Sequence, residues 1–334
     1  MHFLRAFIDL CRHGTCPLET ENKMPRNLVA AAVSGFCFAA LSGCGGGEDD
    51  GNAFNLQVFP TYFAWMNAEI QSAWADGFFG QGSRLVVVDD FEGDLMLEGN
   101  LGLGTEIKPH GDWVSQHVEI MSPGAEITRL DFADTDAITL SSGKLNIVNL
   151  SYGMIGNFVL NADINWSLRE ASIISHADGA AVVVKAAGND QIAVGDASGG
   201  QIDYLSRDLV GKPTAIFVGA MNSHGTVENP ASLANYSNFA GTDLRVQEQF
   251  IVVGVTGGTL ANDGTNLYGT SFAAPQVSAY AAIIGSKFTT ATPLQITDQL
   301  LDTARTDTIQ GYDLAIHGQG EASLSRALAP QSIN

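Results

Sequence analysis

Four polar residues, widely spaced along the 334-residue chain, are of the types that together catalyse acyl transfer. Asp89 ends an apolar run, and His110 stands at the start of a helical pattern. Asn189 follows another apolar run, and Ser271 precedes a long apolar stretch. A carboxylate can orient a histidine, a histidine can act as general base, a serine can attack, and an amide can stabilise an oxyanion. Each residue alone is a weak signal, and only the set predicts catalysis.

The residues that follow Ser271 predict a buried helix. From Val277 to Ile284 nearly every side chain is small or apolar, which is typical of a helix enclosed by protein. Pro275 fits this helix only in its first turn, where backbone N–H groups lack intrahelical partners. A hydroxyl at such a helix start lies beside unbonded N–H groups and the positive end of the helix dipole. An ordinary N-cap serine is the alternative interpretation of Ser271.

Unbroken apolar runs, rich in β-branched residues, predict buried parallel strands. They cover residues 85–88, 147–150, 180–187, 215–218 and 250–255. Helical patterns separate them, so we expect an α/β fold with a mostly parallel sheet covered by helices on both faces. Another helical pattern, from Tyr62 to Trp74, precedes the first strand. Ligands bind at the carboxyl ends of such strands, where Asp89, Ser151 and Asn189 fall.

Two histidines belong to one helical pattern, together with the apolar residues Trp113, Val114 and Val118. His110 would begin this helix, whereas His117 would lie on its packed side. We therefore interpret His117 as the structural histidine.

The N-terminal region predicts export. Residues 24–43 have a short basic start, an apolar core from Leu28 to Leu41 and small residues before Cys44. This core is too short to span a bilayer comfortably. We therefore divide the chain into an upstream extension (1–23, with translation starting at Met24), a signal peptide (24–43), a tether rich in glycine and acidic residues (44–53) and one domain (54–334).

The charge of the chain limits its possible binding partners, and its cysteine content limits disulfides and metal sites. The formal net charge is −20, from 36 acidic and 16 basic residues, which argues against binding to nucleic acid or to an anionic membrane surface. All four cysteines lie in the first 44 residues, so the predicted main domain has neither a disulfide nor a thiolate metal site.

The motifs around the four residues resemble those of subtilisin-like serine proteases (subtilases, peptidase S8). Residues 269–275 read Gly-Thr-Ser-Phe-Ala-Ala-Pro, similar to the nucleophile motif of that family, and residues 186–189 read Ala-Ala-Gly-Asn, similar to its oxyanion motif. Residues 147–153 resemble the strand that pairs with substrate and walls its first pocket. The resemblance extends from about Trp65 to Leu328 and implies a three-layer, subtilisin-like fold.

The resemblance implies a serine endopeptidase in which Asp89, His110 and Ser271 form the triad and Asn189 donates to the oxyanion. It also implies substrate contacts from two segments, namely Ser151, Tyr152, Gly153, Ala186, Ala187 and Gly188. Relatives often bind structural calcium, but no ligand pattern here is dense enough to assign a calcium or other metal site. We expect a monomer that acts on polypeptides and requires no cofactor.

Three departures from the family pattern leave a second function open. Asp89-Asp90-Phe91 stands where the family has Asp-Thr/Ser-Gly, Trp113 replaces the second histidine of His-Gly-Thr-His-Val, and Gln276 replaces a histidine after the motif proline. Asp90 is the alternative orienting acid. The second function is a catalytically impaired domain that binds peptides or a partner protein.

Residues 41–44 read Leu-Ser-Gly-Cys and resemble a bacterial lipobox. The resemblance implies that Cys44 is lipidated, becomes the N-terminus and anchors an exported protein to the cell envelope. Gly45 lacks the aspartate that favours inner-membrane retention, so we expect the outer membrane in a Gram-negative host. A plain signal peptide is the alternative.

Residues 85–90 also resemble the acidic pair that opens a response-regulator receiver domain. That interpretation leaves the serine and asparagine motifs unexplained. The predicted signal peptide also argues against it.

Overall fold

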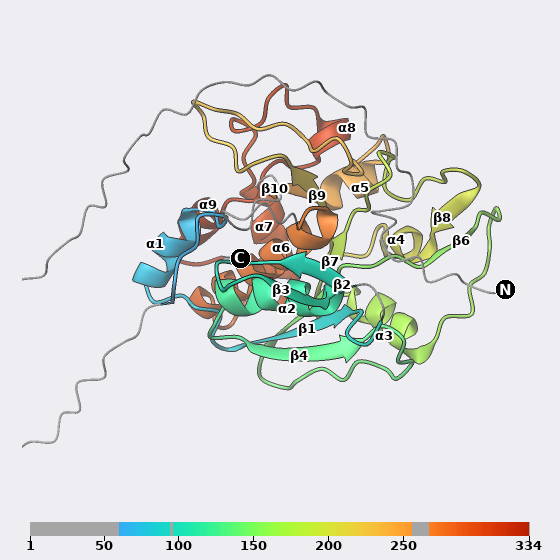
Figure 1. Cartoon of the computed structure of the whole chain (residues 1–334), viewed down its shortest axis with the longest axis horizontal. Coiled ribbons are helices and arrows are strands. Elements are labelled where there is room, and N and C mark those ends of the chain that lie inside the picture. The colour runs from blue at the N-terminus through green and yellow to red at the C-terminus, as the bar shows by residue number, and fades with distance from the viewer. Residues whose placement is uncertain (1–59, 94–95, 256–266, 334) are drawn as a thin grey trace, which may run out of the picture. The chain divides into compact units, whose positions relative to one another are not determined.

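In the computed structural model, a six-stranded parallel sheet lies between two layers of helices (Figure 1). The structure describes residues 60–93, 96–255 and 267–333, which all belong to one compact unit of the chain. The sheet has the order β10-β9-β7-β5-β1-β4. Its strands are β1 (Ser83–Asp89), β4 (Glu126–Asp131), β5 (Leu145–Leu150), β7 (Val182–Ala186), β9 (Ala215–Met221) and β10 (Phe250–Gly254). The predicted α/β fold with a mostly parallel sheet is confirmed.

The predicted signal peptide, the tether and Cys44 lie outside the described residues. These assignments, and the domain boundaries drawn from them, stay predictions.

The apolar runs form strands because helices cover the sheet on both faces. On β1, Leu85 and Val87 pack in one core cluster, whereas Val86 and Val88 pack in another. The first cluster includes α1 (Glu69–Ala75), α2 (His110–Met121), α6 (Thr270–Lys287), α7 (Pro293–Asp302) and α9 (Leu324–Leu328). The second includes α3 (Leu168–His176), α4 (Tyr204–Leu209) and α5 (Leu244–Gln249). The remaining elements are α8 (Leu314–His317) and two antiparallel pairs, β2 (Met96–Gly99) with β3 (Glu106–Pro109) and β6 (Ile155–Asn157) with β8 (Gln201–Asp203).

The helix α6 is enclosed on every side. All of its residues from Thr270 to Ser286 are buried, which confirms the buried helix predicted from its lack of a polar face. Gly285 lets α6 approach β5 closely, because a Cβ atom there would lie 2.5 Å from Cδ2 of Leu145. The sheet and its central helix are therefore in close contact at this position.

Three neighbouring strands end beside one another. In the register of the sheet, Val88 of β1 pairs with Leu150 of β5, which in turn pairs with Lys185 of β7. The residues that follow each strand, including Ser151 and Asn189, therefore leave the sheet at the same edge as Asp89.

The helical pattern that begins at Tyr62 predicted a helix over its whole length, and this prediction is wrong for its first half. The helix α1 begins at Glu69, and residues 60–68 form turns and irregular backbone. The Asn67 side chain accepts a hydrogen bond from the Glu69 backbone N–H (2.9 Å). Such local side-chain bonds favour a helix start at this point over continuation of the helix towards the N-terminus.

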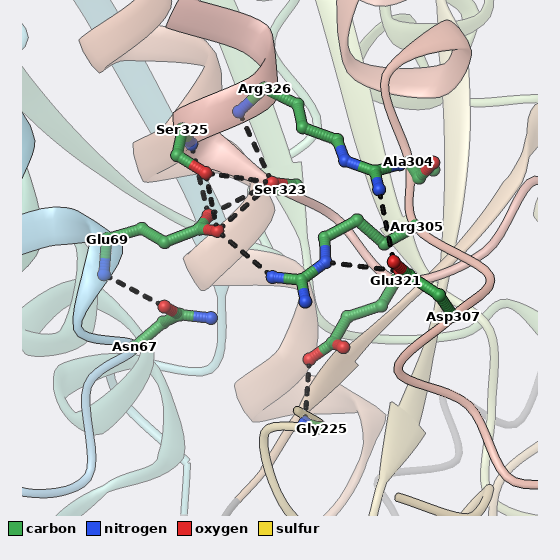
Figure 2. Close-up of polar contacts among 10 residues, drawn as sticks. All are labelled: Asn67, Glu69, Gly225, Ala304, Arg305, Asp307, Glu321, Ser323, Ser325 and Arg326. Atoms are coloured by element: carbon green, nitrogen blue, oxygen red, sulfur yellow. Dashed lines mark hydrogen bonds and ion pairs between the residues drawn. The ribbon is translucent and has the colours of Figure 1, made fainter. Parts of the chain in front are cut away.

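Glu69 joins α1 to the C-terminal segment (Figure 2). Its carboxylate accepts hydrogen bonds from the hydroxyls of Ser323 (3.1 Å) and Ser325 (2.7 Å), and it lies 3.4 Å from the Arg305 guanidinium. Ser323 is also the N-cap of α9. The first and last helices of the described chain are thus held together by one carboxylate.

Glu321 is a second carboxyl in this cluster, and it is almost fully buried (2% exposed). The Gly225 backbone N–H donates to its Oε1 at 3.1 Å (Figure 2). Burial raises the pKa of Glu321 to about 7, against the opposing effects of its hydrogen bonds and of Arg305.

The raised pKa predicts a pH-dependent stability. The folded protein binds the Glu321 proton more tightly than the unfolded chain does, so this contribution is complete below pH 4.5 and is lost as pH rises through about 7. The neutral variant Glu321→Gln lacks this dependence. In urea unfolding, its stability relative to wild type should therefore rise between pH 5 and pH 8.

Glu69→Gln serves as the control, because it weakens the contacts with Ser323, Ser325 and Arg305 and should destabilise at both pH values. A constant difference between Glu321→Gln and wild type over this range would contradict the prediction.

Candidate active site

The predicted acid and the predicted base are in direct contact. Asp89 is the last residue of β1 and His110 is the first residue of α2. The Asp89 Oδ1 lies 2.5 Å from the His110 Nδ1, and both side chains are buried. Burial raises the pKa of the Asp89 carboxyl, while the neighbouring imidazole acts in the opposite direction. A carboxylate bonded to Nδ1 leaves Nε2 as the ring nitrogen able to exchange a proton with another group.

Ser271 lies at the start of α6, close to this pair. The left-handed Gly269 (φ 122°) is the N-cap of α6, and Ser271 is its second residue. The ring of the next residue, Phe272, lies 5.6 Å from the His110 ring between centroids. The Ser271 hydroxyl donates to the backbone carbonyl of Ser151 at 3.3 Å.

The Asn189 amide is held against the start of α6. Its Oδ1 accepts hydrogen bonds from the Thr270 backbone N–H (2.9 Å) and hydroxyl (3.1 Å). Its Nδ2 lies near Gly269, where an added Cβ atom would be 3.4 Å away. With Oδ1 engaged by Thr270, Nδ2 is the end of the amide that can donate to a ligand beside Ser271.

Together these contacts place a carboxylate, an imidazole, a hydroxyl and an amide around the start of one helix. Comparisons with known proteins show the family of the chain. The model of the subtilase family (peptidase S8) matches residues 115–320, which is more than half of the chain. The chain belongs to the subtilase family. The predicted family is thereby confirmed.

Solved structures of proteases share the fold of this subtilase. The prenylagaramide maturation protease PagA matches 78% of the chain and 98% of its own length, with 20% identity and a TM-score of 0.54. MycP1 from Mycobacterium smegmatis matches 81% of the chain and 88% of its own length, with 19% identity and a TM-score of 0.50. No curated protein sequence matches the chain. Asp89 and His110 precede the residues that the family model matches, so their contact is an independent observation.

The acid loop of this subtilase is held without the expected glycine. Asp131, at the end of β4, accepts hydrogen bonds from the backbone N–H groups of Phe91 (2.9 Å) and Glu92 (3.1 Å). The Asp90 carboxylate accepts the Gly93 N–H at 2.5 Å, and so supports the loop, whereas the contact with His110 is made by Asp89. An aspartate on the neighbouring strand therefore stabilises a turn for which the family pattern has a glycine.

Gly111 matches the family motif, and sterics explain why glycine is required at this position. Its N–H donates to the Asp90 carbonyl at 2.8 Å, and a Cβ atom there would lie 2.6 Å from that oxygen. The start of α2 can therefore approach the acid loop only with glycine at this position.

Trp113, the second departure, fastens α2 to the β2–β3 hairpin. Its indole N–H donates to the Leu97 carbonyl at 2.8 Å, and its ring is buried. Gly99 makes room for it, since a Cβ atom there would lie 2.9 Å from the ring. Gln276, the third departure, is buried and donates to the carbonyls of Gly254 (3.1 Å) and Phe272 (3.2 Å). Neither residue contacts the Asp89–His110 pair through these bonds.

The two segments predicted to contact substrate follow the adjacent strands β5 and β7. Ser151 contacts Ser271, and the Gly188 N–H donates to the Thr270 hydroxyl at 3.1 Å, so both segments reach the start of α6. Tyr152 is different: its side chain is buried, with its ring 5.8 Å from that of Phe132. Tyr152 can therefore present its backbone to a ligand, but its ring belongs to the core. Ala186 and Ala187 are buried as well.

An ion pair between the buried Lys185 and the partly exposed Asp203 joins these segments. The Lys185 ammonium at the end of β7 lies 3.0 Å from the Asp203 carboxylate, which also accepts the Met154 N–H at 2.9 Å. Burial alone would raise the pKa of Asp203, but the charge of Lys185 and the hydrogen bonds hold it below its usual value.

Asn238 braces the oxyanion segment, and sequence reasoning missed it. Its amide donates to the Ala187 carbonyl at 2.9 Å, and its Oδ1 accepts the Asp190 N–H at 2.9 Å. Gly188 has a φ of 106°, and a Cβ atom there would lie 2.4 Å from the Asn238 Nδ2. Asn238 is 48 or more residues away in sequence, and no local pattern marks it.

In the part of the chain that the structure describes, no group of three or more His, Cys, Asp or Glu side chains could hold a metal ion. None of the helices described there is long and apolar enough to cross a membrane.

Pro275 lies deeper in α6 than the sequence predicted, and Ser151 compensates for it. The helix begins at Thr270, so Pro275 is its sixth residue and has no N–H to donate to the carbonyl of Ser271, four residues earlier. The Ser151 hydroxyl donates to that carbonyl at 2.9 Å. The motif proline thus frees a buried carbonyl, and a residue of the adjacent strand end bonds it.

The hydrogen bond from the Ser151 hydroxyl to the Ser271 carbonyl predicts the effect of Ser151→Ala on stability. The substitution leaves the buried Ser271 carbonyl without its donor, and should lower the free energy of unfolding by about 1–3 kcal/mol. Ser83→Ala is the matched control, because its buried hydroxyl also donates to an α6 carbonyl, that of Ala282 (3.4 Å), which Ser286 can still bond within the helix. Urea unfolding should show the smaller loss for Ser83→Ala, and equal losses would contradict the explanation.

Proposed function

We propose that this subtilase is a serine endopeptidase that cleaves polypeptides by acyl transfer to water. The observation that carries the proposal is the 2.5 Å contact between the buried Asp89 and His110 side chains, beside the helix start that bears Ser271. A buried carboxylate is costly unless it is paired, and here its partner is an imidazole. Such an arrangement prepares the imidazole to accept a proton.

In the first half of the reaction, the His110 Nε2 accepts the Ser271 proton as the Ser271 oxygen attacks the peptide carbonyl carbon. Asp89 holds the proton-bearing Nδ1 and stabilises the imidazolium. The tetrahedral intermediate collapses to an ester on Ser271, and the imidazolium gives its proton to the leaving amine. Water then attacks the ester with His110 again acting as base, and releases the carboxylic acid.

The oxyanion of each tetrahedral intermediate requires donors fixed before the reaction. The Asn189 Nδ2 is one, because Thr270 holds the other end of the amide. The Ser271 backbone N–H, at the start of α6, is the second.

The substrate would bind as an added strand along Ser151–Gly153, with its second side lined by Ala186–Gly188. Backbone pairing of this kind suits an extended segment of many sequences. We propose a monomer that takes polypeptides as substrate and needs no cofactor for this chemistry.

Peptide binding without cleavage is the alternative function. One observation favours it: the Ser271 hydroxyl donates to the Ser151 carbonyl. A domain that kept this hydroxyl bonded away from His110 would bind a peptide without turnover.

Steady-state kinetics on a peptide substrate distinguish the two functions. Wild type should show turnover, and Ser271→Ala should abolish it. Asn189→Leu should lower kcat about 10²–10³-fold, the range typical of removing one oxyanion donor, with KM nearly unchanged because the oxyanion exists only in the transition state.

Asn229 is exposed, so Asn229→Leu controls for the general effect of replacing an asparagine by a leucine. This variant should keep wild-type kcat. Folding of each variant is checked by circular dichroism. Binding of peptide by wild type without any turnover would favour the alternative, and turnover by Ser271→Ala equal to wild type would remove the mechanism.

We also propose that the protein is exported and held at the bacterial cell envelope through lipidated Cys44. The motif at residues 41–44, after a short apolar core, supports this proposal. Mass spectrometry of the protein purified from its host should find a mature chain that begins with acylated Cys44, and a Cys44→Ala variant should remain unacylated. An unmodified N-terminus at another residue would contradict the anchor.

A further inference from the structure

A row of aromatic rings leads from Trp65, which precedes α1, to the ring of His110. The centroids of Trp65 and His117 lie 5.0 Å apart, those of His117 and Phe272 5.1 Å, and those of Phe272 and His110 5.6 Å. His117 stands in the middle of the row. It is a buried titratable residue that the proposed reaction does not use.

The His117 ring is fixed by more than packing. Its Nδ1 lies 2.7 Å from the carbonyl of Trp113, and since a carbonyl can only accept, this nitrogen carries a proton. Burial lowers the pKa of His117 to about 4, and the charge of a protonated His110 acts in the same direction. His117 is therefore a neutral ring of fixed orientation at neutral pH, nearly parallel to Phe272 (28°).

The outer end of the row is fixed as well. The Trp65 indole N–H donates to the Leu101 carbonyl at 3.3 Å, and the Trp65 carbonyl lies 3.1 Å from the His224 Nε2. Trp65 is buried, and its ring packs against the His117 ring. The fixed Trp65 ring therefore restricts movement of the His117 ring.

His110 needs such support. The hydrogen bond to Asp89 fixes Nδ1, but it does not by itself stop the imidazole from tilting about that atom. A histidine that acts as general base must hold its other nitrogen within about 2.6–3.2 Å of the oxygen that bears the proton. A misplacement of about 1 Å can cost on the order of 10²-fold in rate. Phe272 lies against the His110 ring, at an angle of 42°, and limits that tilt.

We propose that His117, supported by Trp65, is a positioning residue that holds Phe272 against the His110 imidazole. The proposal rests on the proposed peptidase function, in which His110 is the base. The contacts run from ring to ring, so an aromatic shape at position 117 is what positioning requires. Position 117 acts through Phe272, and it does not touch the substrate.

The experiment compares His117→Ala and His117→Phe with a matched control, His317→Ala. His317 is also buried, its Nδ1 also lies near the carbonyl four residues earlier (Asp313, 3.1 Å), and its ring also lies beside an aromatic ring (Tyr312, 5.9 Å). It belongs to α8 and has no ring contact with Phe272 or His110 among those found in the described residues. A loss of stability alone should affect both alanine variants.

For each variant, kcat and KM are measured per folded molecule, and the resonance of the His110 Nδ1 proton is followed by NMR. His117→Ala should lower kcat about 10–100-fold with KM changed less than about twofold, and should broaden or shift that resonance. His117→Phe should restore kcat to within a few-fold of wild type. His317→Ala should keep wild-type kcat and leave the resonance in place.

Wild-type kcat in folded His117→Ala would overturn the proposal, as would folded His117→Phe that is as slow as His117→Ala. Absence of turnover in wild type would instead count against the peptidase function. The NMR comparison would then still decide whether His117 orients the His110 ring, and an unchanged resonance in His117→Ala would refute it.

Discussion

The helix α6 carries polar groups into a core that excludes water, and each of them needs a partner there. Its apolar side chains have no solvent-facing side, so the sheet, α2 and the C-terminal helices must enclose it. The proline at position 275 adds a further demand, because it leaves the Ser271 carbonyl without a helical donor. The position of the candidate nucleophile follows from how these demands are met.

A buried chain of hydrogen bonds meets part of this demand, whereas the Gln276 Oε1 and the Tyr280 hydroxyl of α6 have no hydrogen-bond partner among the described residues. The hydroxyl of Ser278, a residue of α6, donates to the Asn149 Oδ1 of β5 at 3.0 Å. The Asn149 amide in turn donates to the Ser151 hydroxyl at 3.0 Å. Ser151 completes the chain at the Ser271 carbonyl. The candidate nucleophile is therefore tied to the strand that would bind substrate, and a buried polar network of this kind favours one defined arrangement of the core.

Much of the fold could be predicted from the sequence, because parallel strands covered on both faces require unbroken apolar runs. The runs ending at Asp89 and Ala187 predicted both strands and the edge where polar groups gather. The start of α1 could not be predicted, since the competing hydrogen bond from Asn67 is a detail of local geometry.

The candidate site divides in the same way. Residues within the family motifs, such as His110 and Asn189, could be predicted as a set, although their roles stay predictions. The residues that hold them could not be predicted, because Asp131 and Asn238 act across long sequence separations on backbone groups. The role of Trp113 depends on the β2–β3 hairpin, which could not be predicted because its sequence has no alternating apolar pattern.

The central claim is that Ser271 is a nucleophile activated by His110 and Asp89, and covalent labelling tests it most directly. A fluorophosphonate probe reacts with an activated serine hydroxyl, and peptide mapping by mass spectrometry locates the adduct. The account predicts one adduct per molecule, on Ser271, that is absent in Ser271→Ala and strongly slowed in folded His110→Ala. A folded wild-type protein that stays unlabelled, or labelling of His110→Ala at the wild-type rate, would contradict it.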